Sequence, residues 1–320
     1  MLLTLEQVTQ KIQNNETLHI AASQDLLVKL PKGNWIGGST EYFMAQAGGR
    51  IANDVAFVTD FNGYTFTIKD YCVEDVKNIA NDTYDNGFAI LILPFDSHIH
   101  KEYAQNAPTY ENMFLRTVAG WISGVNLSVI GQTPMAVNGQ TLSAYTDKAV
   151  AMHIEVDPGK TVALNTVNIF EQDPSSALIE FKEEGFVVKN CLIDGKEVVF
   201  AEYLAQNNIN TKMPLVGEYS GAGVNVSIKH IENDTVYLYA PVFSGIQYKM
   251  AKSITDYEVA FAKQLQNLSD KNTVFACNCI LNFLYGGLEG KRMESFAGPI
   301  TFGEVAYQLV NQTLVYVEVQ

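Results

Sequence analysis

The sequence predicts an α/β protein with mixed β-sheets flanked by helices, arranged as two halves with internal pseudo-repeats. Apolar runs of strand length alternate with amphipathic stretches of helical period, as in layered α/β folds. Four segments of similar composition, each an apolar run followed by a glycine and a polar residue, also recur at near-equal intervals. Their glycines are Gly37, Gly131, Gly217 and Gly303. A strand that ends in a glycine turn is also common in unrelated proteins, so both repetition and coincidence stay open.

The composition is that of a globular protein with a large interior, since 47% of the 320 residues are hydrophobic and 18% are charged. Single cores stop growing at about 250–300 residues, so two domains or one large multi-sheet body are expected. Lysine and arginine number 21 against 35 aspartate and glutamate, a net charge of −14. Nucleic acids and anionic membranes are therefore poor partners for this chain.

The first residues show neither a basic segment nor an apolar segment of the kind found in secretory signals. The longest apolar run, residues 88–95, is far shorter than the roughly 20 residues that a membrane helix needs. Four cysteines in a chain of this length give no disulfide framework. We therefore expect a cytoplasmic protein.

The N-terminal half begins with a capping box, Thr4 with Gln7, which predicts a helix through about Asn14. Residues 18–22 and 26–30 then read as strands. Further expected elements of this half are a hairpin over 57–68 turned at Asn62-Gly63, a buried strand over 88–95, an amphipathic helix over 110–122 and a strand over 149–156.

The C-terminal half continues with a helix expected over 177–184 and a hairpin whose turn is Asp194-Gly195. A helix from Ser253 to about Leu268 has apolar residues at helical spacing, and a strand is expected over 273–280. The chain should end in two strands, 300–302 and 314–319, with Gly303 as the bend between them.

The first glycine segment continues Gly37-Gly38-Ser39-Thr40. Consecutive glycines can expose backbone N–H groups to the anionic part of a ligand, although they also occur where only turn geometry is required. Neither the Walker pattern nor G-x-G-x-x-G is present, so the segment does not indicate a nucleotide site.

His98 and His100 follow directly after the apolar strand over 88–95, where ligands of α/β sheets collect. Together with Asp96 they are candidate metal ligands, but the sequence offers no firm third ligand, and loop histidines or haem ligation are the alternatives. We assign no metal site.

Short motifs of the C-terminal region together resemble a known pattern. They are Phe275-Ala276-Cys277, Glu294, residues 298–307 and Asn311-Gln312-Thr313-Leu314. This series resembles the C-terminal half of the FIST sensory domain, and Ile36-Gly37-Gly38-Ser39-Thr40 is similar to a segment of that domain's N-terminal half. The resemblance implies a FIST N-like half at residues 1–158 and a FIST C-like half at 159–320.

FIST domains are intracellular modules that bind small ligands, and some bind haem. The resemblance therefore implies a ligand-binding sensor whose partner is a separate protein, such as a histidine kinase, a cyclic-dinucleotide enzyme or a chemotaxis receptor. The ligand-binding residues it implies are Gly37, Gly38, Ser39, Thr40, Cys277, Gly303, Glu304 and Tyr307. One departure matters: where the family continues Cys-x-Gly-Arg, Cys277 is followed by Asn278-Cys279, so an arginine that could bind a carboxylate is missing.

The alternative function is a cysteine- or carboxylate-dependent hydrolase. Cys277 would be the nucleophile, yet a small buried cysteine or a ligand-lining one fits the same pattern. Glu304, directly after the expected bend, can receive a ligand amine or a backbone N–H, and Glu218 after Gly217 has the same two interpretations. We assign no catalytic residue.

Overall fold

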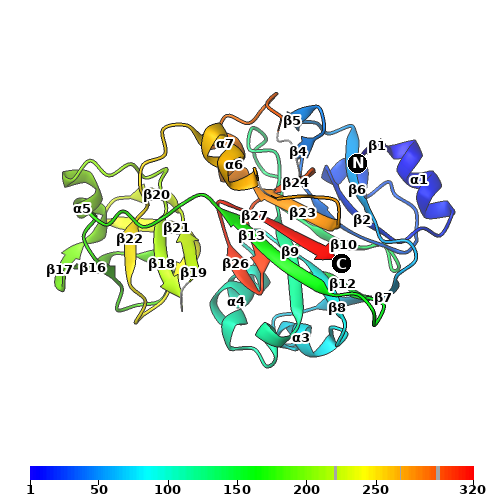
Figure 1. Ribbon diagram of the computed structural model, residues 1–320, viewed down its shortest axis with the longest axis horizontal. Coiled ribbons are helices and arrows are strands. Elements are labelled where there is room, and N and C mark those ends of the chain that lie inside the picture. The colour runs from blue at the N-terminus through cyan, green and yellow to red at the C-terminus, as the bar shows by residue number, and fades with distance from the viewer. Residues whose placement is uncertain (220–221, 267, 293–295) are drawn as a thin grey trace. The chain divides into compact units, whose positions relative to one another are not determined.

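The computed structural model describes residues 1–219, 222–266, 268–292 and 296–320 (Figure 1). It confirms the mixed α/β class, with several mixed sheets and more strand than helix. The chain forms two compact units, unit 1 at residues 1–167, 262–309 and 313–320, and unit 2 at residues 168–261 and 310–312. These units do not follow the expected boundary at residue 158, because unit 1 runs on to residue 167 and residues 262–309 and 313–320 return to it.

Three six-stranded sheets of the described residues belong mainly to unit 1. Sheet 1 has the order β1 (Leu2–Thr4), β6 (Val55–Asp60), β2 (Leu18–Ala22), β3 (Trp35–Ser39), β10 (Ala136–Asn138), β11 (Ser143–Tyr145). Sheet 2 has the order β26 (Gln308–Val310), β25 (Glu304–Ala306), β9 (Thr117–Ser123), β8 (Gly87–Pro94), β12 (Ala149–Glu155), β7 (Thr65–Tyr71). Sheet 3 has the order β13 (Val162–Asn168), β27 (Thr313–Val319), β23 (Thr273–Cys279), β24 (Gly298–Thr301), β4 (Tyr42–Ala45), β5 (Gly48–Ile51).

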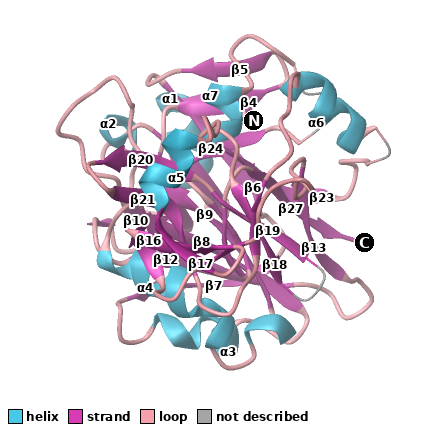
Figure 2. Ribbon diagram, turned by 90° about the vertical axis from the view of Figure 1, so that its left-hand side faces the viewer, coloured by secondary structure: helices cyan, strands magenta, loops and turns pink. Residues whose placement is uncertain are grey.

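Short helices surround these sheets, as Figure 2 shows in cyan. They are α1 (Leu5–Gln13), α2 (Gln24–Leu27), α3 (Ile79–Asp82), α4 (His98–Asn106), α7 (Ile280–Tyr285) and the 3₁₀ turns η1 (Val76–Asn78), η2 (Ala107–Thr109) and η3 (Met113–Leu115). The boundary with unit 2 falls within α6 (Tyr257–Leu265). The apolar face of α1, with Val8 and Ile12, packs into one core cluster with Leu18 and Trp35 of sheet 1.

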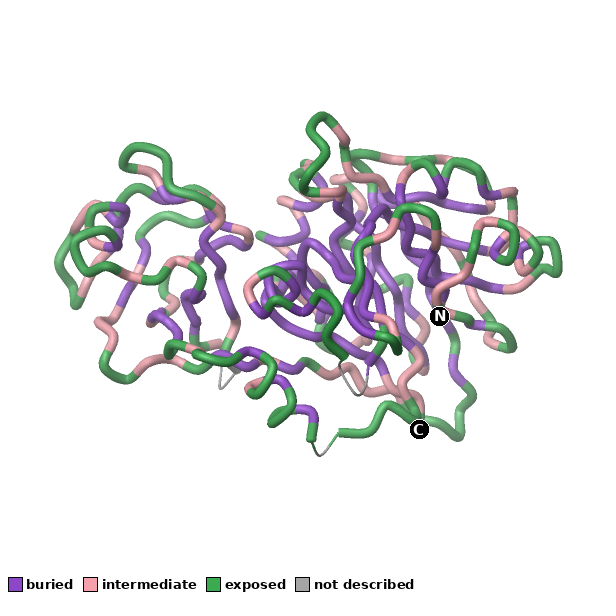
Figure 3. The backbone as a smooth tube through the Cα atoms, turned by 90° about the horizontal axis from the view of Figure 1, so that it is seen from above, coloured by how far each residue is buried: buried purple, intermediate pink, exposed green. Residues whose placement is uncertain are grey.

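Sheets 1 and 2 face each other with little space between them. Gly38 of β3 lies against Trp121 of β9, and a Cβ on this glycine would come within 2.6 Å of the indole. Trp121 also donates its Nε1–H to Nε2 of the buried His19 at 2.8 Å. Burial lowers the pKa of His19 to about 3, so its imidazole is neutral at physiological pH. Strands β3 and β8 are buried along their whole length, and Figure 3 colours buried residues purple.

Unit 2 contains one six-stranded and one three-stranded sheet within its described residues. The larger sheet has the order β17 (Lys196–Val199), β16 (Asn190–Ile193), β14 (Ile179–Glu180), β22 (Tyr248–Met250), β18 (Leu215–Tyr219), β19 (Ala222–Val226). The smaller sheet has the order β15 (Gly185–Val188), β21 (Thr235–Val242), β20 (Ile228–Glu232). Helix α5 (Phe200–Gln206) packs beside β17 and β21.

Several expected elements are confirmed. The capping box of Thr4 and Gln7 is complete at the start of α1. Strands β8 and β12 occupy the two expected apolar runs, and β8 is buried along its whole length. The hairpin of β16 and β17 turns at Asp194 and Gly195, both at positive φ, as an Asp-Gly turn requires.

Other expectations were wrong. The strand expected over 26–30 begins within helix α2. The helix expected over 110–122 is replaced by η3 and β9, and the helix expected over 177–184 is replaced by a segment that contains β14. The Asn62-Gly63 turn does not close a hairpin, since β6 pairs with β1 and β2 whereas β7 pairs with β12 in another sheet. Similarly, β24 and β27 lie on opposite sides of β23 and do not pair with each other.

The pseudo-repeats are not confirmed. Gly37 and Gly217 lie inside strands β3 and β18, whereas Gly131 and Gly303 adopt positive φ, +88° and +144°, outside any strand. The four segments thus place their glycines in two different backbone settings. Among the described helices, none is long and apolar enough to cross a membrane.

The contact between sheets 1 and 2 can be tested at Gly38. Gly38→Ala would place Cβ 2.6 Å from Trp121 Cη2 and 2.7 Å from Ile92 Cγ2. Overpacking of this kind costs about 1–3 kcal/mol, so thermal unfolding should occur several degrees lower. Gly159→Ala is the control, because nothing lies within 4 Å of a Cβ there. Equal melting temperatures for the two variants would contradict this packing.

Candidate functional site

The carboxyl ends of parallel strands meet inside unit 1. Strands β3, β9 and β24 each run parallel to a neighbour, β2, β8 and β23 respectively. Gly124 N donates to Ser39 O at 2.7 Å, and Thr40 Oγ1 donates to Ile300 O at 2.8 Å. Phe302 N and Ile122 O complete the connection between β24 and β9 at 2.9 Å. This strand-end junction, defined by residues 39–40, 123–124 and 301–304, unites the two motif regions singled out from sequence.

The loop of residues 125–135 is tied at both of its ends to residues of the junction or directly after it. Asn126 Nδ2 donates to Glu41 Oε2 at 2.7 Å, and Leu127 N donates to Tyr42 OH at 3.0 Å. At its other end, Met135 N donates to Ser39 Oγ at 2.9 Å. The middle of the loop is apolar yet faces solvent, with Ile130 fully exposed. These bonds leave the loop attached at both ends and uncovered at its tip.

Ser123, the last residue of β9, has an unusual hydroxyl. Its side chain is 0% exposed, and Oγ has no hydrogen-bond partner among the described residues. A buried polar atom without a partner costs about 1–3 kcal/mol. The junction thus contains an unused hydrogen-bonding group at a strand end, where ligands of α/β sheets bind.

Glu304 of the junction is fully buried, and desolvation raises the pKa of its carboxyl to about 8. Hydrogen bonds from Thr301 and Thr313 lower the pKa of this carboxyl, but burial outweighs them. The position of the Thr301 hydroxyl is also compatible with a protonated carboxyl. Thr301 Oγ1 lies 2.9 Å from Glu304 Oε1 and 3.2 Å from Asn278 O, but it has one proton to donate. If Oε1 carries the carboxyl proton and donates it to Thr301, the threonine can serve Asn278, and all three groups are satisfied.

The other carboxyl oxygen, Glu304 Oε2, accepts from Thr313 Oγ1 at 2.8 Å and from Thr313 N at 3.4 Å. Thr301 and Thr313 were not among the residues expected at the site. Thr313 belongs to the Asn-x-Thr motif quoted for the resemblance, so a signal for it was present. Ser123 carried no such signal, because it follows an apolar run that had been expected to be a helix.

Cys277 and Cys279 are two residues apart on β23, both are thiols and not halves of a disulfide, and both are about 1% exposed. Cys277 Sγ lies 3.6 Å from Gly120 O. Burial, together with the nearby Glu304 carboxyl, raises the pKa of the Cys277 thiol well above its usual value. Cys277 is therefore a neutral thiol, without the stabilisation that a nucleophilic thiolate requires.

The remaining expected ligand residues lie at different distances from this chemistry. Gly37 and Gly38 are inside β3, where a Cβ would meet Leu27 and Trp121 respectively, so packing accounts for both glycines. Gly303 provides the bend that carries the chain from β24 to β25. Tyr307 lies at the far end of β25, where its carbonyl accepts from Tyr103 OH at 2.8 Å and its ring contacts Phe114. Glu294 lies outside the described residues.

His98 and His100 begin helix α4 instead of continuing the strand. His98 is exposed and its Nδ1 lies 2.9 Å from Asp147 Oδ2, whereas His100 is buried with Nδ1 accepting from Asp96 N at 3.2 Å. The two rings therefore have separate environments. In the part of the chain that the structure describes, no three histidine, cysteine, aspartate or glutamate side chains are grouped to hold a metal ion.

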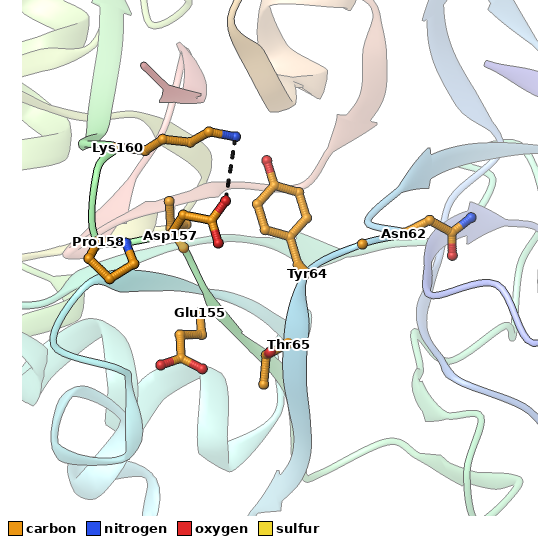
Figure 4. A pocket seen from close by; sticks show the side chains of 9 residues that line it. Asn62, Tyr64, Thr65, Glu155, Asp157, Pro158 and Lys160 are labelled. Atoms are coloured by element: carbon orange, nitrogen blue, oxygen red, sulfur yellow. Dashed lines mark ion pairs between the residues drawn. The ribbon is translucent and has the colours of Figure 1, made fainter.

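Unit 1 also has open surface pockets. The one in Figure 4 has a volume of about 510 Å³ and lies between β7 and the turn that follows β12. Tyr64 stands beside Asp157 and Lys160, whose charged groups are 4.0 Å apart, and Glu155 and Thr65 lie below them in this view (Figure 4). The amide of Asn86 donates to the carbonyls of Val156 and Asp157 and so holds this turn. Asn62 and Gly63 of the expected turn line the pocket, but none of the expected ligand-binding residues does.

Comparison with protein families places the chain in a known family. Residues 3–320 match the model of a family described as a family of unknown function (DUF6976). No curated protein matches the chain. The match covers both units, and it leaves the FIST resemblance a prediction.

The protonation of Glu304 predicts a specific dependence of stability on pH. A carboxyl whose pKa rises from 4.5 to about 8 on folding binds more protons in the folded state between these values. Its contribution to the free energy of unfolding is therefore fully present below pH 4.5. This contribution declines by roughly several kcal/mol as the pH rises to about 8. Glu304→Gln, which keeps a neutral side chain of the same shape, should remove this decline.

Urea unfolding of both proteins between pH 5 and pH 9 measures the effect. We expect the wild type to lose stability relative to Glu304→Gln as pH rises. The exposed Glu155→Gln serves as the control and should follow the wild type. A constant difference between wild type and Glu304→Gln across this range would show that Glu304 is not protonated in the folded protein.

Proposed function

The chain belongs to this family of unknown function, DUF6976, and we propose that it is an intracellular small-ligand-binding sensor that acts through a separate partner protein. The observation that carries the proposal is the unpartnered hydroxyl of Ser123 at the strand-end junction. A ligand that hydrogen-bonds to it would remove an existing cost, and the strand ends supply further polar groups nearby.

The electrostatics of the site support binding rather than catalysis. Glu304 carries its proton near neutral pH, and the thiol of Cys277 is neutral. A hydrolase of the alternative class needs an ionised nucleophile or base with access to substrate and water. Buried neutral groups lack both, whereas they can donate and accept hydrogen bonds to a captured molecule.

The loop of residues 125–135 is the element that a ligand would have to displace. It is attached to the junction through Ser39, Glu41 and Tyr42. A ligand that binds only when these bonds are broken shifts the population towards a detached loop. The exposed apolar residues Leu127, Val129 and Ile130 then give a partner a surface whose position reports on the ligand.

The partner and cofactor classes follow from the FIST resemblance: a histidine kinase, a cyclic-dinucleotide enzyme or a chemotaxis receptor, with haem as a candidate ligand. The junction residues themselves supply hydroxyls and one carboxyl. Histidine, cysteinate, methionine and tyrosinate are the usual axial ligands of haem iron. The junction residues do not fit that set, so the proposed mechanism contains no step through haem.

Native mass spectrometry of the protein as purified, repeated after addition of haemin, tests the proposal. We expect a retained small molecule that is lost in Ser123→Val and kept in the control Ser143→Ala, which alters a serine of β11 away from the junction. A bare mass in both conditions would contradict ligand capture. An adduct that is unaffected by Ser123→Val would move the ligand away from the junction.

The cysteine-dependent hydrolase can be tested separately by alkylation. Because burial raises the pKa of the Cys277 thiol, iodoacetamide at neutral pH should leave Cys277 and Cys279 unmodified in the folded protein and modify both in urea. Cys72, which is partly exposed, is the internal control for reagent activity. Selective modification of folded Cys277 would instead favour the hydrolase.

A further inference from the structure

A second pocket of unit 1 is distinct from the strand-end junction and is lined only by polar residues. Its volume is about 530 Å³. Sites that bind small molecules typically have volumes of about 300–1,000 Å³. The helices α3 and α4, which lie next to each other in Figures 1 and 2, form its walls together with η1 and η2. The apolar residues of the same helices, Ile79 and Tyr103 among them, are buried beneath it.

The walls of this pocket are held by hydrogen bonds between separate elements. Asn81 Nδ2 of α3 donates to Glu111 Oε2 at 3.2 Å, and Asn112 Nδ2 donates to Asn81 Oδ1 at 2.8 Å. Across the pocket, Tyr110 OH lies 3.3 Å from Glu102 Oε1 of α4. Both ends of the Asn81 amide are thereby fixed, so the polar groups that face the pocket are positioned before any ligand arrives.

Other polar groups of the pocket are unused. The side-chain amides of Asn78 and Asn106 make no hydrogen bond to another described residue, and the Lys77 ammonium makes no ion pair within the described chain. An amide both donates and accepts, as a hydroxyl does. Glu102 and Glu111 add acceptors, and together with Lys77 they leave the lining with a formal charge close to neutral and slightly negative.

These features select the class of ligand. An apolar molecule would lose the hydration of eight polar side chains without replacing it. An anion such as phosphate would be repelled by two carboxylates and attracted by only one ammonium. A polycation would be repelled by the ammonium of Lys77. We propose that this pocket binds a small neutral polyhydroxylated molecule, a monosaccharide or polyol, whose hydroxyls donate to Glu102 and Glu111 and accept from the amides of Asn78 and Asn106.

Ligand-observed NMR on the full chain tests the proposal, with D-glucose and sorbitol as neutral probes and inorganic phosphate and putrescine as charged ones. We expect saturable binding of at least one neutral probe and of neither charged probe. The double variant Asn78→Leu and Asn106→Leu should weaken the binding of the neutral probe about ten-fold or more, because each change removes an amide that both donates and accepts hydrogen bonds. Gln105→Leu, on the exposed side of α4, is the matched control and should leave the affinity unchanged.

Three results would overturn the proposal: no saturable binding by a neutral probe, tighter binding of phosphate or putrescine, or neutral binding that the Asn78 and Asn106 changes leave intact. The single variants Asn78→Ala and Asn106→Ala provide the same comparison if the double variant does not fold. Because Ser123 is not part of this pocket, Ser123→Val should not alter the binding, and failure of the sensor proposal leaves this one standing.

Discussion

Three strands of unit 1 end inside its core, and the polar groups at those ends need partners that water cannot supply. Thr40 meets this need through a carbonyl 260 positions away in the chain, and Thr301 and Thr313 meet it through Glu304. Sheet 1 approaches sheet 2 closely where glycines face the other sheet. This approach depends on these connections, because small residues let the two backbones come close enough to form hydrogen bonds. The hydroxyl of Ser123 is the exception, and the proposed ligand site follows from it.

The same burial keeps formal charge out of the junction and the core around it. Glu304 retains its proton, His19 remains without one, and the Cys277 thiol stays neutral, each because the surrounding protein disfavours the ionised form. A site of this kind distinguishes ligands by the placement of donors and acceptors and offers little attraction to ions. The polar pocket formed by α3 and α4 differs in being open to solvent, with carboxylates in its lining.

Local signals predicted local structure, and failed where distant contacts decide. The capping box of Thr4, the apolar run of β8 and the Asp194-Gly195 turn depend on neighbours in sequence and were confirmed. Residues 117–123 have helical periodicity but form β9, because Gly120 allows the backbone to approach Leu91 O in the parallel partner β8. The sequence identified Gly303 and Glu304 as part of a site. It could not show that they pair with β9, because the two segments are far apart in the chain.

The insertion of residues 168–261 between two parts of unit 1 affects the order in which the units can fold during synthesis. Unit 2 is nearly contiguous, so most of it has left the ribosome before β23, β24 and β27 are made. Unit 1 must wait for β27, since Thr313 supplies the partner of Glu304 and the strand completes sheet 3. At roughly 5–20 residues per second this wait lasts roughly 8–30 seconds, during which sheets 1 and 2 expose apolar surface. A nascent chain of this design therefore has a built-in period in which chaperones can bind it.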